Sequence, residues 1–115
     1  MSVADEGHHY PGTGKLVRDN IPDIVRTHGA EPIIEVADQD QYRHLLRQKL
    51  LEEAQEFLAS EDVEELADVL EVVRALSMDL GTDLDSLEKI RQDKMSERGA
   101  FEKRLIWYGN RPGLA

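Results

Sequence analysis

The sequence predicts a mainly α-helical fold, in which an antiparallel helical hairpin or bundle is joined by a third helix and a small two-stranded β element. Two observations predict the hairpin: apolar residues recur at helical spacing along two long segments, and the connection between these segments is short. Residues that cap helices and glycines that end them also mark the segment limits. At 115 residues the chain is expected to form one domain, with residues 1–14 as a flexible N-terminal lead-in and residues 15–115 as the helical domain.

A short helix and two strands are expected outside the hairpin. The helix can be capped by Asn20, has Pro22 in its first turn, and ends at Gly29. The sequence EPIIEVA that follows favours a short strand at residues 33–36. The sequence FEKRLIWY near the C-terminus favours a closing strand at residues 102–108, which is expected to pair with the first strand.

Three longer helices are expected between these strands. They run over residues 38–59, 60–80 and 84–98, each opened by Asp, Ser or Thr, and glycines follow the last two. The first apolar stripe consists of Leu46, Leu50, Ala54, Phe57 and Leu58, and the second of Leu66, Val69, Leu70, Val73, Leu76 and Leu80. Two such stripes with a short connection are expected to pack against each other.

Composition and charge exclude several function classes. The net charge of −10, from 24 acidic and 14 basic side chains, repels a nucleic-acid polymer and an anionic membrane surface. A small phosphorylated molecule stays compatible, because a bound divalent cation reverses the local sign. The chain has no cysteine, no apolar stretch of membrane-spanning length and no signal-peptide pattern, so a cytoplasmic protein is expected.

The most informative stretch is residues 50–73, which contains nine carboxylates and neither Lys nor Arg. Like charges four residues apart destabilise a helix, and a cation would convert this repulsion into coordination. Glu53 and Glu56 on one helix, and Glu65 and Asp68 on the next, are pairs at i,i+3 that border the apolar stripes. A hairpin can bring the four together, and oxygen donors without His or Cys suit Mg²⁺, or else Mn²⁺. The alternative is an ordinary solvated acidic surface.

Two basic clusters are candidates for binding phosphate or other parts of a substrate. One row shares a face of the last helix and consists of Arg91, Lys94 and Arg98. Lys can hold phosphate oxygens as a point charge and Arg as a bidentate fork, although a helix C-terminus also favours such residues on an ordinary surface. The other cluster precedes the first helix and consists of Lys15, Arg18 and Asp19. A helix N-terminus attracts anions, and the alternative is an Arg–Asp surface pair of little energetic value.

Four segments of the chain resemble a known group of enzymes. The motif EExxE followed by ExxD, here EEAQE at 52–56 and ELAD at 65–68, is similar to that of the all-α nucleoside triphosphate pyrophosphohydrolases. The segments KLVRDNIP at 15–22 and KMSERGAF at 94–101 resemble a MazG-like, phosphoribosyl-ATP-pyrophosphohydrolase-like branch of that superfamily. The resemblance covers nearly the whole chain. Only residues 57–64 separate the two half-motifs, whereas many members have a longer insert there.

The resemblance implies a Mg²⁺-dependent hydrolase that cleaves the bond between the α- and β-phosphates of a nucleotide and releases a nucleoside monophosphate and pyrophosphate. It implies that the metal ligands are Glu53, Glu56, Glu65 and Asp68. It also implies that Glu52 or Glu53 activates the attacking water, and that Lys94 and Arg98 contact phosphate. Such enzymes are usually homodimers or homotetramers, and association would also help a domain of this small size.

Several functions remain open from the sequence. Within the enzyme class, nucleotide pool cleansing and phosphoribosyl-ATP hydrolysis in histidine synthesis both fit the resemblance. A non-catalytic regulatory module that binds a nucleotide or Mg²⁺ is the second class, and a helical adaptor without a metal is the third. The last predicts that divalent ions leave the melting temperature unchanged, because only a metal that binds the folded state stabilises it.

Overall fold

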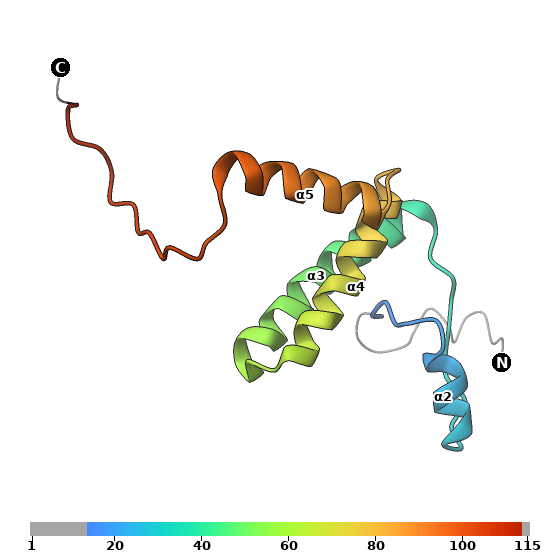
Figure 1. Ribbon diagram of the computed structural model, residues 1–115. Helices are drawn as coiled ribbons and strands as arrows, with labels where there is room; N and C mark the ends of the chain where they lie inside the picture. The colour runs from blue at the N-terminus through green and yellow to red at the C-terminus, as the bar shows by residue number, and fades with distance from the viewer. Residues whose placement is uncertain (1–13, 114–115) are drawn as a thin grey trace.

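The computed structural model describes residues 14–113, and its helices confirm the mainly α fold class (Figure 1). The helices are α2 (Ile21–Thr27), α3 (Gln39–Ser60), α4 (Val63–Asp79) and α5 (Leu84–Arg98). The predicted lead-in lies outside the described residues, apart from its last glycine. Across residues 14–113, no helix combines the length and the apolar composition needed to cross a membrane.

Side-chain caps set where the three long helices begin. Asp38 forms a capping box on α3: its Oδ1 accepts from the Gln41 backbone N–H at 2.9 Å, and the Gln41 side chain accepts from the Asp38 N–H at 3.0 Å. Asp62 and Asp83 cap α4 and α5 by accepting from backbone N–H groups of the first turn. The hydrogen bonds from Ser86 lower the pKa of Asp83. These are among the capping residues that the sequence predicts.

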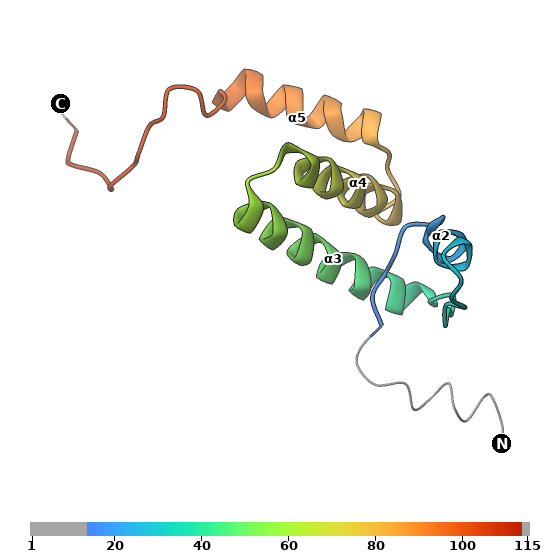
Figure 2. The ribbon, with the colours of Figure 1, turned by 90° about the horizontal axis from the view of Figure 1, so that it is seen from below.

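The predicted hairpin is present, with α3 and α4 side by side and antiparallel (Figure 2). The chain reverses over Glu61 and Asp62, and Glu61 takes a left-handed conformation with a φ of 56°. At the open end of the hairpin, Arg43 Nε donates to Asp79 Oδ2 at 2.9 Å, which ties the start of α3 to the end of α4. The two helices are therefore fixed to each other at both ends.

The apolar core within one chain is small. Leu46 of α3 and Val72 of α4 are the buried apolar residues of the described part of the chain, and of these two only Leu46 is fully buried. Leu66 and Leu70 of the second predicted stripe remain exposed, because α4 has apolar residues on more sides than α3 alone covers. The radius of gyration is 20.5 Å, against about 13 Å for a compact domain of this length.

The predicted two-stranded β element is wrong, since residues 14–113 contain no β-strand. Residues 33–36 lie in the connection between α2 and α3, whereas residues 102–108 follow the far end of α5 (Figure 1). The 15 residues of α5 extend over about 22 Å and separate the two segments. An extended segment forms a strand only where a second one supplies its backbone partners, so neither becomes a strand here.

Candidate metal centre

The acidic residues singled out in the sequence come together across the hairpin. Oxygen atoms of Glu52, Glu53 and Glu56 lie within 4.8 Å of one another on α3. Oxygen atoms of Glu53, Glu65 and Asp68 do the same across α3 and α4. Glu53 belongs to both groups, so the two sets of carboxylates form one cluster around it.

The helical repeat explains this convergence. Residues three apart lie on one side of a helix, one above the other, and Glu53 with Glu56 and Glu65 with Asp68 are such pairs. Each pair borders the apolar stripe through which its helix packs on the other. Packing the stripes of an antiparallel hairpin therefore turns the two pairs toward each other.

Glu53 is the most deeply placed carboxylate of the cluster. It is only 7 % exposed, and Lys49 Nζ lies 3.3 Å from its Oε1. Its Oε2 is buried and has no hydrogen-bond partner among the described residues. Burying a charged oxygen without a hydrogen-bond partner costs free energy, and native proteins rarely contain such an oxygen. The oxygen is thus placed to accept a cation.

Crowding of like charges raises the pKa of two other carboxyls in the cluster. The charge of Glu53 is the main cause that raises the pKa of Glu56, and burial adds to it. Burial is the main cause for Glu65, whose pKa is raised further by the charges of Glu56 and Asp68. Both shifts reflect anionic groups held close together in partial desolvation, and a divalent cation would oppose them.

Basic side chains surround the cluster. Lys15 Nζ lies 3.4 Å from Glu52 Oε1, and Arg18 Nη2 lies 2.7 Å from Asp68 Oδ1. The structure thus brings these two predicted substrate-binding residues to the carboxylates, from the segment that precedes α2. Lys49 also contacts the cluster, at 3.6 Å from Glu52. Sequence analysis missed Lys49, although its spacing of three and four residues from Glu52 and Glu53 is a usable signal.

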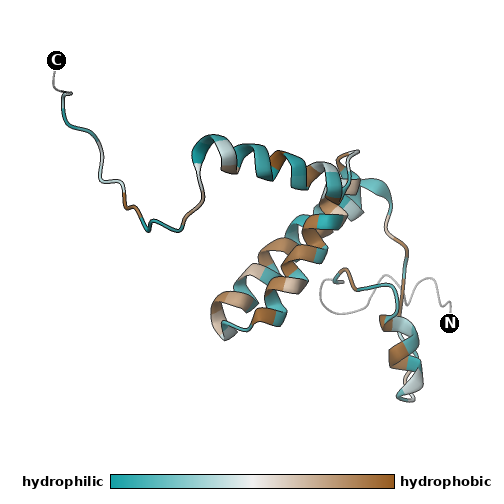
Figure 3. Ribbon diagram, viewed as in Figure 1, coloured by the Kyte–Doolittle hydropathy of each residue, from teal (hydrophilic) through white to brown (hydrophobic). Residues whose placement is uncertain are grey.

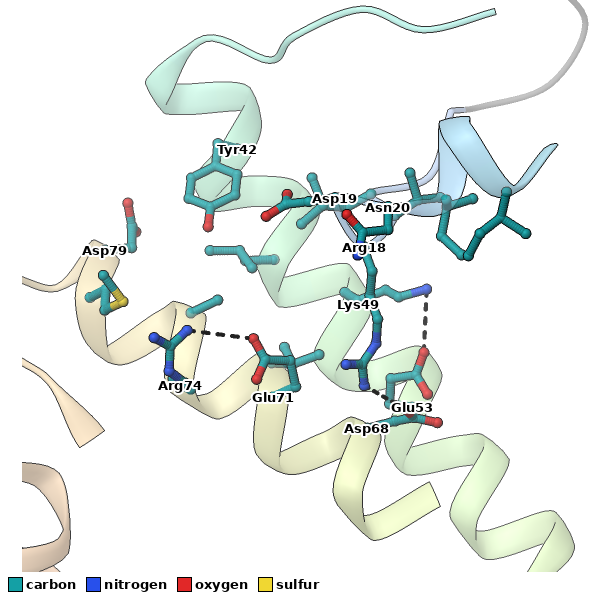
Figure 4. A pocket seen from close by; sticks show the side chains of 18 residues that line it. Arg18, Asp19, Asn20, Tyr42, Lys49, Glu53, Asp68, Glu71, Arg74 and Asp79 are labelled. Carbon is teal, nitrogen blue, oxygen red and sulfur yellow. Dashed lines mark hydrogen bonds and ion pairs between the residues drawn. The ribbon is translucent and has the colours of Figure 1, made fainter. Parts of the chain in front are cut away.

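A groove of about 910 Å³ adjoins the cluster, between residues 16–24 and the two hairpin helices (Figure 4). Glu53 and Asp68 lie at one end of this groove, and Tyr42 and Asp79 lie at the other. Asp19, the third predicted residue of the segment before α2, also lines it. The apolar lining includes Leu16, Val17, Ile21, Ile24, Leu46 and Val72. The groove therefore combines a charged end with an apolar wall, as small-molecule sites do. Tyr42 was not predicted, because no motif or spacing in the sequence marks it.

The basic row of α5 does not reach the cluster within one chain. Arg91 pairs with Glu88 of its own helix, and Arg98 lines a separate hollow with residues 99–106. Lys94 lies between them on the same exposed helix, which runs away from the open end of the hairpin (Figure 2). The predicted phosphate contacts of these three residues stay a prediction.

Comparison of the chain with models of protein families, with curated proteins and with solved structures finds no match. The resemblance to the all-α pyrophosphohydrolases thus stays an interpretation of the sequence motifs. A functional class has to be inferred from the carboxylates, the basic side chains and the groove.

Proposed function

We propose that the protein is a Mg²⁺-dependent nucleotide pyrophosphohydrolase, which cleaves the α–β phosphate bond of a nucleoside triphosphate to give a monophosphate and pyrophosphate. The observation that carries this proposal is the buried Oε2 of Glu53, which has no partner within residues 14–113 and belongs to a cluster of carboxylates from two helices. The two helical half-motifs of the sequence supply these carboxylates. Removal of nucleotides unsuitable for synthesis is the role that fits such an activity.

The donor set fits a hard divalent cation. Glu53, Glu56, Glu65 and Asp68 offer carboxylate oxygens without His or Cys, which suits Mg²⁺ or Mn²⁺. A cation among them would give the Glu53 oxygen its missing partner. It would also offset the repulsion that is the main cause of the raised pKa of Glu56 and that adds to the effect of burial on the pKa of Glu65. When bound, Mg²⁺ would polarise phosphate oxygens and increase the acidity of a coordinated water.

The basic residues at the rim would hold the phosphate chain. Arg18 and Lys15 now lie against Asp68 and Glu52, so a triphosphate placed over the carboxylates comes within their reach. Arg can bind two phosphate oxygens at once, and Lys acts as a point charge. Phosphoryl transfer depends mainly on such positioning and charge neutralisation, because little covalent help is needed.

In this proposal Glu52 accepts the proton of the attacking water. Its Oε1 is held by Lys15 and Lys49, which leaves Oε2 for a proton, and it is less buried than Glu53. Water attacks one phosphorus atom of the α–β anhydride, its proton passes to Glu52, and the bond to the bridging oxygen breaks.

The nucleoside would occupy the groove beside the cluster, where an apolar wall and Tyr42 can contact a base.

The experiment is a pyrophosphate-release assay with a panel of standard, deoxy, non-standard and phosphoribosyl nucleotides, with Mg²⁺ and with EDTA. We expect Mg²⁺-dependent release that falls at least 100-fold in Glu53→Ala. The matched control is Glu64→Ala, an exposed carboxylate of α4 outside the cluster, which should keep full activity. Full activity of Glu53→Ala would remove this site from the mechanism.

The same proteins separate the competing functions. A regulatory module would gain thermal stability with Mn²⁺ or Mg²⁺, and lose that gain in Glu53→Ala, yet release no pyrophosphate from any nucleotide. A helical adaptor would show neither effect. Preference for the phosphoribosyl substrate would favour a role in histidine synthesis over pool cleansing.

A further inference from the structure

The C-terminal arm, residues 101–113, extends away from the rest of the molecule (Figure 1). Its apolar segment Leu105–Ile106–Trp107–Tyr108 has side chains that are 72 to 89 % exposed. The polar contacts of Trp107 stay inside the arm, where its Nε1 donates to Gly109 O and Asn110 Oδ1 at 3.0 Å. Four adjacent apolar residues in an extended segment are unusual on a free surface, and they mark a binding surface.

The link between α2 and α3, residues 30–38, has the same character (Figure 3). Ile33, Ile34 and Val36 are exposed, and Val36 is 96 % exposed. In the described part of the chain, no backbone hydrogen bond joins residues 31–37 or 105–109 to another segment. Both segments are rich in β-branched or aromatic residues, which favour pairing in a sheet. Each therefore presents an open edge suited to an added strand.

The two segments carry opposite charges. The acidic side chains of the link are Glu31, Glu35 and Asp38, and the link contains no basic residue. The basic side chains of the arm are Lys103, Arg104 and Arg111, and its acidic side chain is Glu102. An arm laid along a link would therefore place unlike charges next to each other.

Helix α5 keeps the arm away from the link of its own chain. The arm starts at the end of α5 that is far from the hairpin, and the link lies near the other end of that helix (Figures 1 and 2). The 15 residues of α5 place about 22 Å between those ends. The segment that the arm can cover most directly therefore belongs to another molecule.

We propose that the C-terminal arm of one copy docks along the α2–α3 link of a second copy. The two chains exchange arms mutually and so form a two-fold symmetric dimer. In each exchange, the apolar residues of arm and link cover each other, the basic arm faces the acidic link, and backbone groups that are open in one chain gain partners. This assembly is independent of the proposed hydrolase activity, because no residue of the carboxylate cluster takes part.

The first test is cross-linking between two singly substituted proteins. The chain has no cysteine, so Val36→Cys and Ile106→Cys each introduce the sole thiol. One protein carries an extra mass tag, and the two are mixed and oxidised. We expect a tagged–untagged disulfide dimer on a denaturing, non-reducing gel.

The control for this test is Val63→Cys, which places a thiol at another exposed position, at the tip of the hairpin. Paired with Ile106→Cys, it should cross-link at least 10-fold less. Equal cross-linking of the two pairs would overturn the proposal. The doubly substituted chain gives a further check: a disulfide that forms within single chains at all dilutions would place the arm on its own link and also overturn it.

The second test is a charge-reversal cycle measured by sedimentation equilibrium on the full chain. These exposed substitutions leave the helices and their caps intact. Glu35→Lys alone and Lys103→Glu alone should each weaken dimerisation about 2- to 5-fold. The double variant should regain part of the loss, since the two substituted positions again carry opposite charges. A wild-type protein that stays monomeric at all concentrations, or a double variant weaker than both single variants, would refute the arm exchange.

Discussion

Glu53 holds its neighbours in an electrostatically unfavourable environment. Its charge is the main reason that the pKa of Glu56 is raised above 4.5. A carboxyl with a raised folded pKa binds more protons in the folded state than in the unfolded state. Its contribution to the free energy of unfolding is therefore fully present at low pH. That contribution declines as pH rises from about the unfolded pKa through the raised folded pKa.

Glu56→Gln should remove this pH dependence, because the amide does not ionise. In EDTA, we expect the variant to become more stable relative to the wild-type protein as pH is raised from about 4 to 7. The measurement is the thermal midpoint of both proteins across this range. Glu64→Gln is the control, since it removes an exposed carboxylate outside the cluster. A constant difference between Glu56→Gln and wild type would contradict the crowding of Glu53 and Glu56.

Sequence reasoning could identify the residues of the cluster but not their surroundings. The spacing of Glu53, Glu56, Glu65 and Asp68 is local information, and an antiparallel hairpin converts it into proximity. By contrast, the ion pair of Arg18 with Asp68 joins residues 50 apart in the chain, and helical periodicity does not specify such a contact. The groove likewise depends on where residues 16–24 lie against the hairpin.

At the scale of the element, the capping box of α3 offers a clear energetic test. Asp38→Ala removes the acceptor of the Gln41 backbone N–H and one side of the reciprocal pair. We expect a loss of about 1 kcal/mol in the free energy of unfolding, measured by urea denaturation at fixed protein concentration. Asp40→Ala, in the same first turn but without a capping bond, should cost at most a few tenths of a kcal/mol, roughly. Equal losses for the two variants would show that charge near the helix end, not the cap, is responsible.

Helix limits were predictable because their signals are local, and the β element was not. Asp38, Asp62 and Asp83 cap their helices through bonds to residues two or three positions away. The segments at 33–36 and 102–108 have the composition of strands. A strand also needs a partner, however, and the position of that partner is set by the length and direction of α5. Local composition therefore identified two segments able to pair but did not place them together.

At the scale of the whole molecule, one chain buries little of its apolar surface. Leu46 and Val72 are the buried apolar residues within residues 14–113, and the shape is extended, at 79 × 31 × 27 Å. Small domains already have a narrow margin of stability. A second copy that covers the arm and the link would supply burial that the single chain lacks. Folding and association are then expected to be coupled.

Coupling predicts that thermal stability depends on protein concentration. In a dimer that dissociates on unfolding, each tenfold rise in concentration adds about 1.4 kcal/mol to the stability of the assembly, which should raise the melting temperature by a few degrees. Leu105→Asp puts a charge into the apolar segment of the arm, so its melting temperature should be lower and nearly independent of concentration. Circular dichroism from micromolar to hundreds of micromolar protein measures both effects. A wild-type melting temperature that does not change with protein concentration would mean that the single chain is stable alone. The exposed apolar segments would then not stabilise the fold through a dimer.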